Sequence, residues 1–312
     1  MKCLILGANG FIGRNLVETL LEKGKEELTL FDREDIKYLR EGYQKSEYKF
    51  HIIQGQFCMS TDFKTLTKGI DIVYHLVSTS LPNNSNNNIG GGLVDNVVVT
   101  SLLLDACVKN GVKKIVFLSS GGTVYGISSS MPLNEDSINN PISGYGLQKI
   151  TIEKLLYLYW YIYGLDYRII RLSNPYGKYQ KPNGVQGVVT TFIYEVMHNH
   201  NLRVYGDGSV IRDYIYIDDA IAAIQKIVDY QGKYRIFNVG SGKGYSINEI
   251  INIIETVVKK KVDIIYDGNR KSDVPTNILD ITRYRSCFGE IVNVNLNEGI
   301  RRTYQYFKDN YV

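Results

Sequence analysis

Short runs of apolar and β-branched residues alternate along this chain with longer segments whose apolar residues recur every three or four positions. The short runs are apolar almost without interruption, which is typical of strands in a parallel sheet that helices cover on both faces. We expect strands at residues 2–6, 27–31, 49–53, 71–76, 114–119, 167–172 and 235–240. The helical pattern covers residues 11–23, 93–110 and 143–163. This alternation predicts an α/β fold with a doubly wound parallel sheet.

The same pattern predicts how the chain divides. We expect residues 1–172, with 235–240 returning to the sheet, to form a Rossmann domain, and residues 173–312 to form a smaller α/β cap. Residues 82–92, PNNSNNNIGGG, are polar and glycine-rich, and they follow the fourth predicted strand. We expect a mobile loop there, at the edge of the sheet where ligands bind. The segment 155–163, LLYLYWYIY, is apolar around most of a helix, so it should be buried against another element or a second subunit.

Composition narrows the class of partner. The chain has 312 residues, of which 44% are hydrophobic, so it can bury a substantial core. Its formal charge of +4 arises from 36 basic and 32 acidic residues, and these are scattered without a polybasic block. We therefore expect a small-molecule partner rather than nucleic acid or a membrane. We expect no membrane segment, on the reading that no apolar stretch approaches the length needed to span a bilayer.

Cysteines and histidines point to neither disulfides nor metal. Cys3, Cys58, Cys107 and Cys287 are far apart, which favours a reducing compartment, and the cytoplasm is the expected location. The sequence HNH at residues 198–200 places two histidines two positions apart, and on a helix such side chains point to different sides. We expect no metal site.

A glycine motif follows the first predicted strand. GANGFIG supplies Gly7, Gly10 and Gly13 at the opening of a helix. Glycines at this spacing allow a tight turn, a close approach to a pyrophosphate, and packing of the helix on the strand. Asp32 stands at the end of the second predicted strand, where a carboxylate can accept hydrogen bonds from both ribose hydroxyls. Together these residues predict a dinucleotide site, and Asp32 favours NAD over NADP because it would repel a 2′-phosphate.

Tyr145 and Lys149 lie four positions apart in a predicted helix, so they share one face. A free phenol has a pKa of about 10, and a nearby ammonium together with a positively charged nicotinamide ring would lower it toward neutrality. Tyr145 would then act as general base and general acid on a hydroxyl, and Lys149 would also hold the nicotinamide ribose.

Several longer motifs appear in a particular order. They are GANGFIG (7–13), SSGGTVYG (119–126), SGYGLQK (143–149), RLSNPYG (171–177), YGDGSVIRDYIYIDD (205–219), FNVGSG (237–242) and DGNRKSDVP (267–275). Over almost its whole length the chain resembles the extended short-chain dehydrogenase/reductases, and specifically the NAD-dependent epimerase/dehydratase family. The resemblance implies NAD as the cofactor, and it adds Phe11, Ile12 and Leu76 to the cofactor-binding residues.

The resemblance also implies catalytic roles. Tyr145 and Lys149 take the positions of the family's catalytic pair, and a serine or threonine after the fifth strand normally bonds to the substrate. Here that position is Gly121. Ser120 and Thr123 remain as nearby hydroxyl donors, and we favour Thr123.

For the substrate, the resemblance places Asn174, Arg212, Arg270 and Asp273 against the nucleotide. Two arginines suit a diphosphate, because guanidinium groups hold phosphate oxygens through paired donors. Asn277 stands where similar enzymes use side-chain size to admit or exclude an N-acetyl group at C2 of the sugar. Asn leaves some room, so we expect both UDP-hexoses and UDP-N-acetylhexosamines to enter.

These implications favour a nucleotide-sugar 4-epimerase that acts on UDP-glucose and UDP-galactose through transient oxidation at C4. The family's dehydratases and decarboxylases would carry acidic residues just before VYG, where this chain has Gly122 and Thr123. A nucleotide-sugar 4-keto reductase remains an alternative, as does a non-catalytic dinucleotide sensor. The resemblance also implies a homodimer with its seam along helices 93–110 and 143–163. The identity of the sugar, the nucleotide base and the physiological direction stay open.

Overall fold

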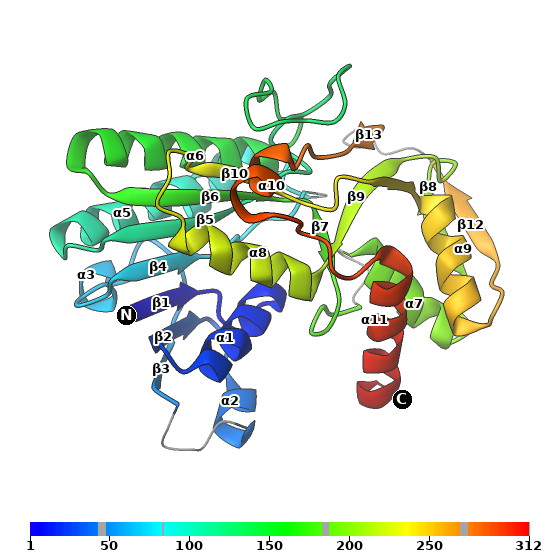
Figure 1. Cartoon of the computed structure of the whole chain (residues 1–312), viewed down its shortest axis with the longest axis horizontal. Coiled ribbons are helices and arrows are strands. Elements are labelled where there is room, and N and C mark those ends of the chain that lie inside the picture. Colours follow the sequence, from blue (N-terminus) through cyan, green and yellow to red (C-terminus); the bar gives the residue numbers. More distant parts are fainter. Residues whose placement is uncertain (43–47, 83, 183–186, 269–273, 312) are drawn as a thin grey trace. The chain divides into compact units, whose positions relative to one another are not determined.

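The chain folds into two compact units. The computed structural model describes residues 1–42, 48–82, 84–182, 187–268 and 274–311. The first unit comprises Met1–Ser119, Ser143–Ile170 and Ile227–Ile236, and the second comprises Ser120–Ile142, Arg171–Lys226 and Phe237–Val312. Figure 1 labels the elements of both.

A seven-stranded sheet forms the core of the first unit, and it confirms the predicted fold class. Its strand order is β10-β6-β5-β4-β1-β2-β3, and the pairs from β3 to β5 are parallel. The strands are β1 (Lys2–Leu6), β2 (Glu27–Asp32), β3 (Phe50–Gln54), β4 (Ile72–His75), β5 (Lys114–Ser120), β6 (Asp166–Leu172) and β10 (Ile236–Val239). Every predicted strand is present within one residue or so at each end, and the last residues of β5, β6 and β10 are counted in the second unit.

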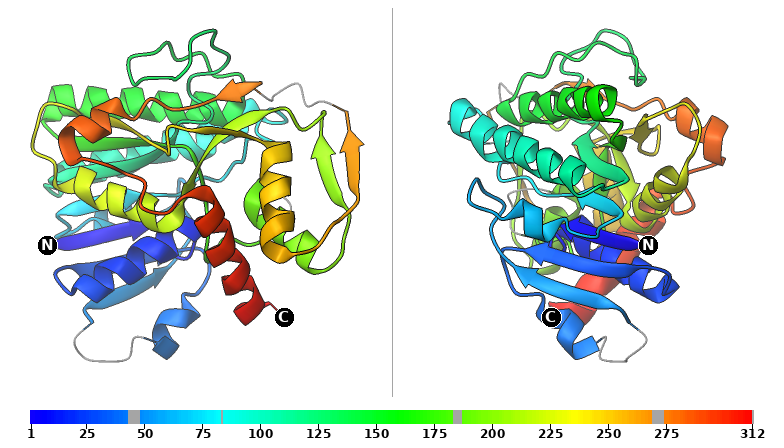
Figure 2. Two further views of the ribbon diagram at one scale, coloured as in Figure 1. Left: turned by 45° about the vertical axis from the view of Figure 1, so that its right-hand side comes forward. Right: turned by 90° about the vertical axis from the view of Figure 1, so that its left-hand side faces the viewer.

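Helices flank this sheet. They are α1 (Phe11–Lys23), α2 (Lys37–Gly42), α3 (Phe63–Leu66), α4 (Ile89–Gly92), the π-helical turn η1 (Leu93–Val98), α5 (Val99–Lys109) and α6 (Gly144–Tyr163). The dark blue α1 lies on one face of the sheet, and the teal α5 and green α6 lie on the other (Figure 2). Helix α1 ends because Gly24 adopts φ of 62°, and α6 begins where the Ser143 side chain accepts a hydrogen bond from the Gly146 N–H.

The continuous helical stretch Ile89–Lys109 corrects one expectation. By length and composition it is apolar enough to cross a membrane, whereas we expected no such segment from the sequence. The helix is a core element of the first unit, since Leu103 and Leu104 are fully buried and the Thr100 hydroxyl lies 2.9 Å from Nε2 of His75. A buried helix passes the same test as a membrane span because both are rich in apolar residues.

The glycine-rich segment 82–92 is also more structured than predicted. Helix α4 begins at Asn88, whose side chain accepts a hydrogen bond from the Gly91 N–H. Asn86 Oδ1 accepts the N–H of Gly144 at 2.7 Å, and a Cβ on Gly144 would lie 2.5 Å from the Ser85 carbonyl oxygen. The segment is therefore attached to the start of α6, a contact between distant residues that the local composition did not reveal.

The second unit contains two smaller sheets. β9 (Ile211–Tyr216) pairs with β7 (Asn174–Tyr176), β11 (Gly244–Ser246) and β13 (Thr276–Asn277), and β8 (Leu202–Tyr205) pairs with β12 (Ile264–Asp267). The helices are α7 (Val188–Met197), α8 (Ile217–Asp229), α9 (Ile247–Val258), α10 (Thr282–Phe288) and α11 (Leu296–Asn310).

Residues 120–142 belong to this second unit, whereas the sequence placed them in the first. A buried polar network explains the difference. The Arg171 guanidinium, 1% exposed, donates to the Tyr125 hydroxyl at 3.1 Å and to the Glu135 carbonyl oxygen at 3.0 Å. Tyr125 donates in turn to Asn238 at 2.6 Å, and the Asn238 N–H donates to the Glu135 carboxylate at 2.9 Å. Such a network joins segments that are far apart in sequence.

Candidate functional site

The glycine motif forms a tight turn between β1 and α1. Gly7 has a φ of 86°, a region that residues with a Cβ rarely adopt. A Cβ on Gly13 would stand 2.0 Å from the Gly7 carbonyl oxygen, so only glycine allows α1 to pack this close to the turn. Gly10 is the N-cap of α1, and within the described part of the chain it supplies no side-chain hydrogen bond to the N–H groups of the first turn. This cradle, which a Cβ would fill, fits the pyrophosphate of a dinucleotide.

Asp32 lies beside that turn, at the carboxyl end of β2. Its Oδ2 accepts the N–H of Asn9 at 2.9 Å, and its side chain is half-buried. Phe11 and Ile12 occupy the first turn of α1 and are half-buried, and the N–H of Leu76 donates to the Leu6 carbonyl at 3.1 Å. The structure thus brings all the predicted cofactor residues of β1, α1, β2 and the segment after β4 to one edge of the first unit.

A cavity of about 420 Å³ adjoins this edge, and sequence reasoning missed it. It is lined by Phe31, Ile53, Gly55, Gln56, Cys58, Ser60, Thr61, Asp62, Thr65 and Leu66. Phe31, which lines this cavity, immediately precedes Asp32 in the sequence. No motif in the sequence marks residues 53–66, and only the pairing of β2 with β3 places them beside the end of β2.

Tyr145 and Lys149 do share one face of α6. The Lys149 ammonium lies 5.4 Å from the centroid of the Tyr145 ring and 4.7 Å from that of Phe117. Its Nζ donates to the Leu118 carbonyl oxygen at 2.8 Å, which fixes the side chain against β5. The predicted i, i+4 pairing is therefore present as geometry.

The electrostatics differ from the expectation. Burial raises the pKa of Tyr145 to about 12, rather than lowering it, and burial lowers the pKa of Lys149 to about 7 while the charge of Glu153 opposes that change. Desolvation disfavours the charged form of each group, and spacing along a helix says nothing about desolvation. Burial is the dominant effect on the phenol, and additional positive charge, such as an oxidised nicotinamide ring would bring, would oppose it.

The hydroxyl donors Ser120 and Thr123 lie in the second unit. Thr123 Oγ1 is buried without a hydrogen-bond partner among the described residues. Gly121 occupies the position where a serine or threonine was expected, and a Cβ there would lie 2.5 Å from Cδ1 of Leu279 and 3.0 Å from the Arg171 carbonyl oxygen. A side chain at this position would have to displace the Leu279 side chain.

Asn174, Arg212 and Asn277 lie on neighbouring strands of the second unit. Nδ2 of Asn174 donates to the Asp213 carbonyl at 2.8 Å, and the Arg212 guanidinium donates to the carbonyls of Ile211 and Val274. Asn277 is fully buried in β13 opposite Arg212, and its Nδ2 donates to the Gly121 carbonyl at 3.1 Å. Oδ1 of Asn277 has no partner among the described residues.

Arg270 and Asp273, which the sequence also assigned to the nucleotide, lie outside the described residues.

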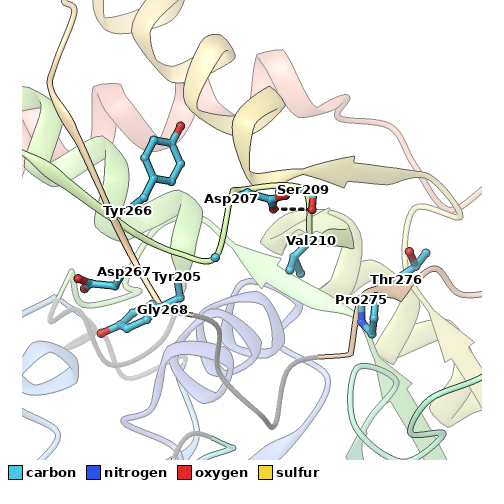
Figure 3. A pocket seen from close by; sticks show the side chains of 10 residues that line it. Tyr205, Asp207, Ser209, Val210, Tyr266, Asp267, Gly268, Pro275 and Thr276 are labelled. Carbon is cyan, nitrogen blue, oxygen red and sulfur yellow. Dashed lines mark hydrogen bonds between the residues drawn. The ribbon is translucent and has the colours of Figure 1, made fainter.

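A larger cavity, of about 890 Å³, lies in the second unit next to the paired strands β9 and β13 (Figure 3). It is lined by Tyr205, Gly206, Asp207, Ser209, Val210, Tyr266, Asp267, Gly268, Pro275 and Thr276. Tyr205 and Tyr266 come from the paired strands β8 and β12, and Thr276 opens β13 beside Asn277. Sequence reasoning assigned none of these residues, although Tyr205 to Val210 belong to the quoted YGDGSV motif.

Asp213 is a further residue that the sequence did not identify. It is fully buried, and its carboxylate accepts hydrogen bonds from the N–H and hydroxyl of Ser241, both at 2.7 Å, and from the N–H groups of Gly242 and Leu279 at 3.0 and 3.3 Å. Burial raises the pKa of Asp213 to about 6, and these hydrogen bonds oppose the rise. The carboxylate holds β9, the 240–242 loop and the segment after β13 together, next to Arg212.

Within the described residues, no three His, Cys, Asp or Glu side chains gather into a possible metal site. The rings of His198 and His200 are closer than expected, with centroids 5.9 Å apart, because α7 ends at Met197.

Comparisons with known proteins agree with this geometry. The model of the NAD dependent epimerase/dehydratase family matches residues 3–240. UDP-glucose 4-epimerase of Mycolicibacterium smegmatis is 33% identical over 315 residues, which cover 99% of each chain. dTDP-4-dehydro-6-deoxyglucose reductase of Escherichia coli is 33% identical over 95% of this chain and 94% of its own. The crystal structure of UDP-glucose 4-epimerase from Thermotoga maritima with UDP-glucose matches with a TM-score of 0.91 and 29% identity over 100% of both chains.

Proposed function

Because this chain belongs to the NAD-dependent epimerase/dehydratase family, we propose that it is a UDP-sugar 4-epimerase with UDP-glucose and UDP-galactose as its substrates. The chain is an NAD-dependent enzyme of nucleotide-sugar chemistry, and the proposal concerns its reaction and its sugar. The observation that carries it is the arrangement of Tyr145 over a buried, anchored Lys149 in the unit that also holds the glycine cradle and Asp32.

Some of these residues bind the cofactor, and others transfer a proton. The N–H groups at the start of α1 hold the pyrophosphate, and Asp32 accepts hydrogen bonds from ribose hydroxyls. When bound, NAD would supply reversible hydride transfer at C4 of the sugar, with no net redox change over the whole reaction. The Tyr145 oxygen accepts the proton of the C4 hydroxyl and later returns it. The Lys149 ammonium stabilises the tyrosinate, and its positive charge is needed for that role.

The second unit supplies the residues proposed for the nucleotide. The 890 Å³ cavity is large enough for a ligand of nucleotide size, and the ring of either Tyr205 or Tyr266, which point to opposite sides of the β8–β12 pair (Figure 3), offers a face on which a flat base can stack. Arg212 provides a guanidinium for the diphosphate, with Asn174 beside it and Arg270 and Asp273 as the further residues that the motif implies. Thr123 Oγ1, buried without a partner among the described residues, is the proposed donor to the sugar, with Ser120 as the second candidate.

We retain the hypothesis that Asn277 admits N-acetylated sugars, because its side chain is small and Oδ1 has no partner among the described residues. If turnover assays show that UDP-N-acetylglucosamine and UDP-N-acetylgalactosamine are both excluded, this part of the proposal is wrong.

A homodimer is the proposed assembly. The segment 155–163 was expected to be buried against another element or a second subunit, and in the single chain Tyr157 is 51% exposed, Tyr161 74% and Ile162 55%. Val98 and Leu102 of η1 and α5 are also exposed, so these helices present apolar surface that a second copy would cover. We also retain the cytoplasm as the proposed location, which is supported by the absence of any disulfide among the four free cysteines.

The deciding experiment uses the purified protein without added cofactor. It is incubated separately with UDP-galactose and UDP-N-acetylgalactosamine, the sugar nucleotides are separated, and the denatured protein is analysed for released dinucleotide. We expect interconversion at C4 and recovery of NAD, and we expect Tyr145→Phe to lower kcat by at least about a hundredfold.

Two other outcomes identify the alternatives. Stoichiometric oxidation of added NADH or NADPH with a 4-keto sugar, without epimerisation, identifies a reductase, an alternative that the similarity to the E. coli reductase supports. Dinucleotide binding without turnover of any sugar nucleotide indicates a sensor.

A further inference from the structure

Glu153 is a buried carboxylate that the proposed mechanism does not use. It lies on α6 one helical turn after Lys149, and it is 3% exposed. The Ser119 hydroxyl donates to its Oε1 at 2.5 Å. An ionisable side chain this deep is costly to bury, so its presence calls for an electrostatic reason.

Apolar residues also attach this helix to the sheet. Ile152 and Leu156 are each 2% exposed and already pack α6 against the core that includes Phe117 of β5. Apolar contacts of this kind attach a helix to a sheet without a carboxylate. Glu153 itself interacts with the end of strand β5.

That part of β5 holds Lys149 as well. Leu118 accepts the Lys149 ammonium through its carbonyl oxygen at 2.8 Å, and the next residue, Ser119, binds Glu153 through its side chain. Two consecutive strand residues therefore fix two helix residues that are one turn apart. This arrangement sets the direction of both side chains. It places the Glu153 carboxylate on the turn of α6 that follows Lys149.

Among the described residues, few other groups act on the charge of the Lys149 ammonium. Besides Glu153, the described groups that face the ammonium or act on its charge are the Tyr145 and Phe117 rings of α6 and β5, the Leu118 carbonyl and His75 of β4. His75 is neutral near pH 7, because burial, and next the charge of Lys149, lower its pKa to about 3. Glu153 is the acidic group in this set, and it raises the pKa of Lys149 against the lowering by burial.

We propose that Glu153, anchored by Ser119 one helical turn after Lys149, is a residue whose carboxylate keeps the Lys149 ammonium charged. The inference rests on the proposed function, because it assigns Lys149 the role of a charged partner for the tyrosinate. A lysine whose pKa is lowered toward 7 by burial loses its charge in a growing fraction of molecules as pH rises. A fixed carboxylate nearby moves that loss to higher pH.

Glu153→Gln tests the charge with the least change in shape, since the amide oxygen can still accept the Ser119 hydrogen bond. A nearby opposite charge changes a pKa by about one unit or more. We therefore expect the midpoint of Lys149 titration to fall by at least about one pH unit. We also expect the alkaline limb of kcat/KM to move in the same direction, with about tenfold lower kcat/KM above the wild-type midpoint and little change well below it.

The primary readout is the titration of Lys149 itself, followed by NMR of protein labelled with ¹³C and ¹⁵N in lysine. The signal that disappears in Lys149→Arg identifies the residue. Glu153→Asp keeps the charge on a shorter side chain and should give an intermediate midpoint, so it also serves if the glutamine variant does not fold. Glu255→Gln removes a buried carboxylate from α9 of the second unit and should leave the Lys149 midpoint unchanged.

This readout does not depend on turnover. If the Lys149 midpoint in folded Glu153→Gln stays within about 0.3 pH units of wild type, the role of Glu153 is refuted even when the protein is an active epimerase. If the midpoint falls as expected but the wild type converts no sugar nucleotide, the electrostatic role stands and the proposed function fails.

Discussion

Substitution of Gly13 by alanine should disrupt the dinucleotide cradle more than any other single methyl group. The new Cβ would lie 2.0 Å from the Gly7 carbonyl oxygen, 2.9 Å from the Gly7 carbonyl carbon and 3.0 Å from the Ala8 carbonyl carbon. Ordinary van der Waals contact begins near 3.4 Å, so α1 would have to move by more than an ångström. All three neighbours are backbone atoms, and no side-chain rotation can relieve the clash.

Overpacking of a tight interior costs about 1–3 kcal/mol, and a clash with backbone falls at or above the upper end. We expect Gly13→Ala to lose at least about 3 kcal/mol of unfolding free energy, or to displace α1 and lose NAD affinity by at least about a hundredfold, since 1.4 kcal/mol corresponds to a factor of ten. Urea unfolding followed by circular dichroism measures the first quantity. Isothermal titration of NAD into the protein stripped of dinucleotide measures the second.

Gly90→Ala is the matched control. Gly90 is exposed in α4, its φ is not positive, and a Cβ there would meet nothing within 4 Å. Alanine should leave stability unchanged or raise it by up to about 1 kcal/mol, because it restricts the unfolded chain. If Gly13→Ala matches the wild type in both unfolding free energy and NAD affinity, the account of the turn is wrong.

Three further predictions concern the second unit. Thr123→Val should leave the free energy of unfolding unchanged or raise it by up to about 1 kcal/mol, because it removes a buried hydroxyl that has no described partner. In the same variant kcat should fall at least about tenfold, and an unchanged kcat would exclude Thr123 from catalysis. Arg212→Lys should raise KM for UDP-glucose about tenfold or more with a smaller change in kcat, and an equal KM would remove Arg212 from diphosphate binding. Asp213 has a folded pKa of about 6, above its ordinary value of 3.8, so its contribution to stability is fully present below pH 3.8 and is lost as pH rises through 6. Compared with Asp213→Asn in urea unfolding, the stability advantage of the wild type should therefore be greater by about 2–3 kcal/mol at pH 4 than at pH 7, and a constant difference would contradict the assignment.

The sequence by itself determined the features that depend on neighbouring residues. The strands and helices of the first unit follow from apolar periodicity, the glycine cradle follows from residue spacing, and the shared face of Tyr145 and Lys149 follows from the pitch of a helix. The order of motifs along the chain was sufficient to indicate the family. These are local properties, so the linear order of residues carries them.

Only the tertiary structure decided how deeply each group is buried and which distant segments meet. Spacing predicted that Lys149 would acidify Tyr145, but burial raises the pKa of that tyrosine, because desolvation depends on every element packed around it. Asp213 joins residues that are 28 and 66 positions away, and Arg171 attaches residues of the 120–142 segment to the second unit. Hydrogen bonds of this kind connect positions that the sequence separates, and no pattern along the chain reveals them.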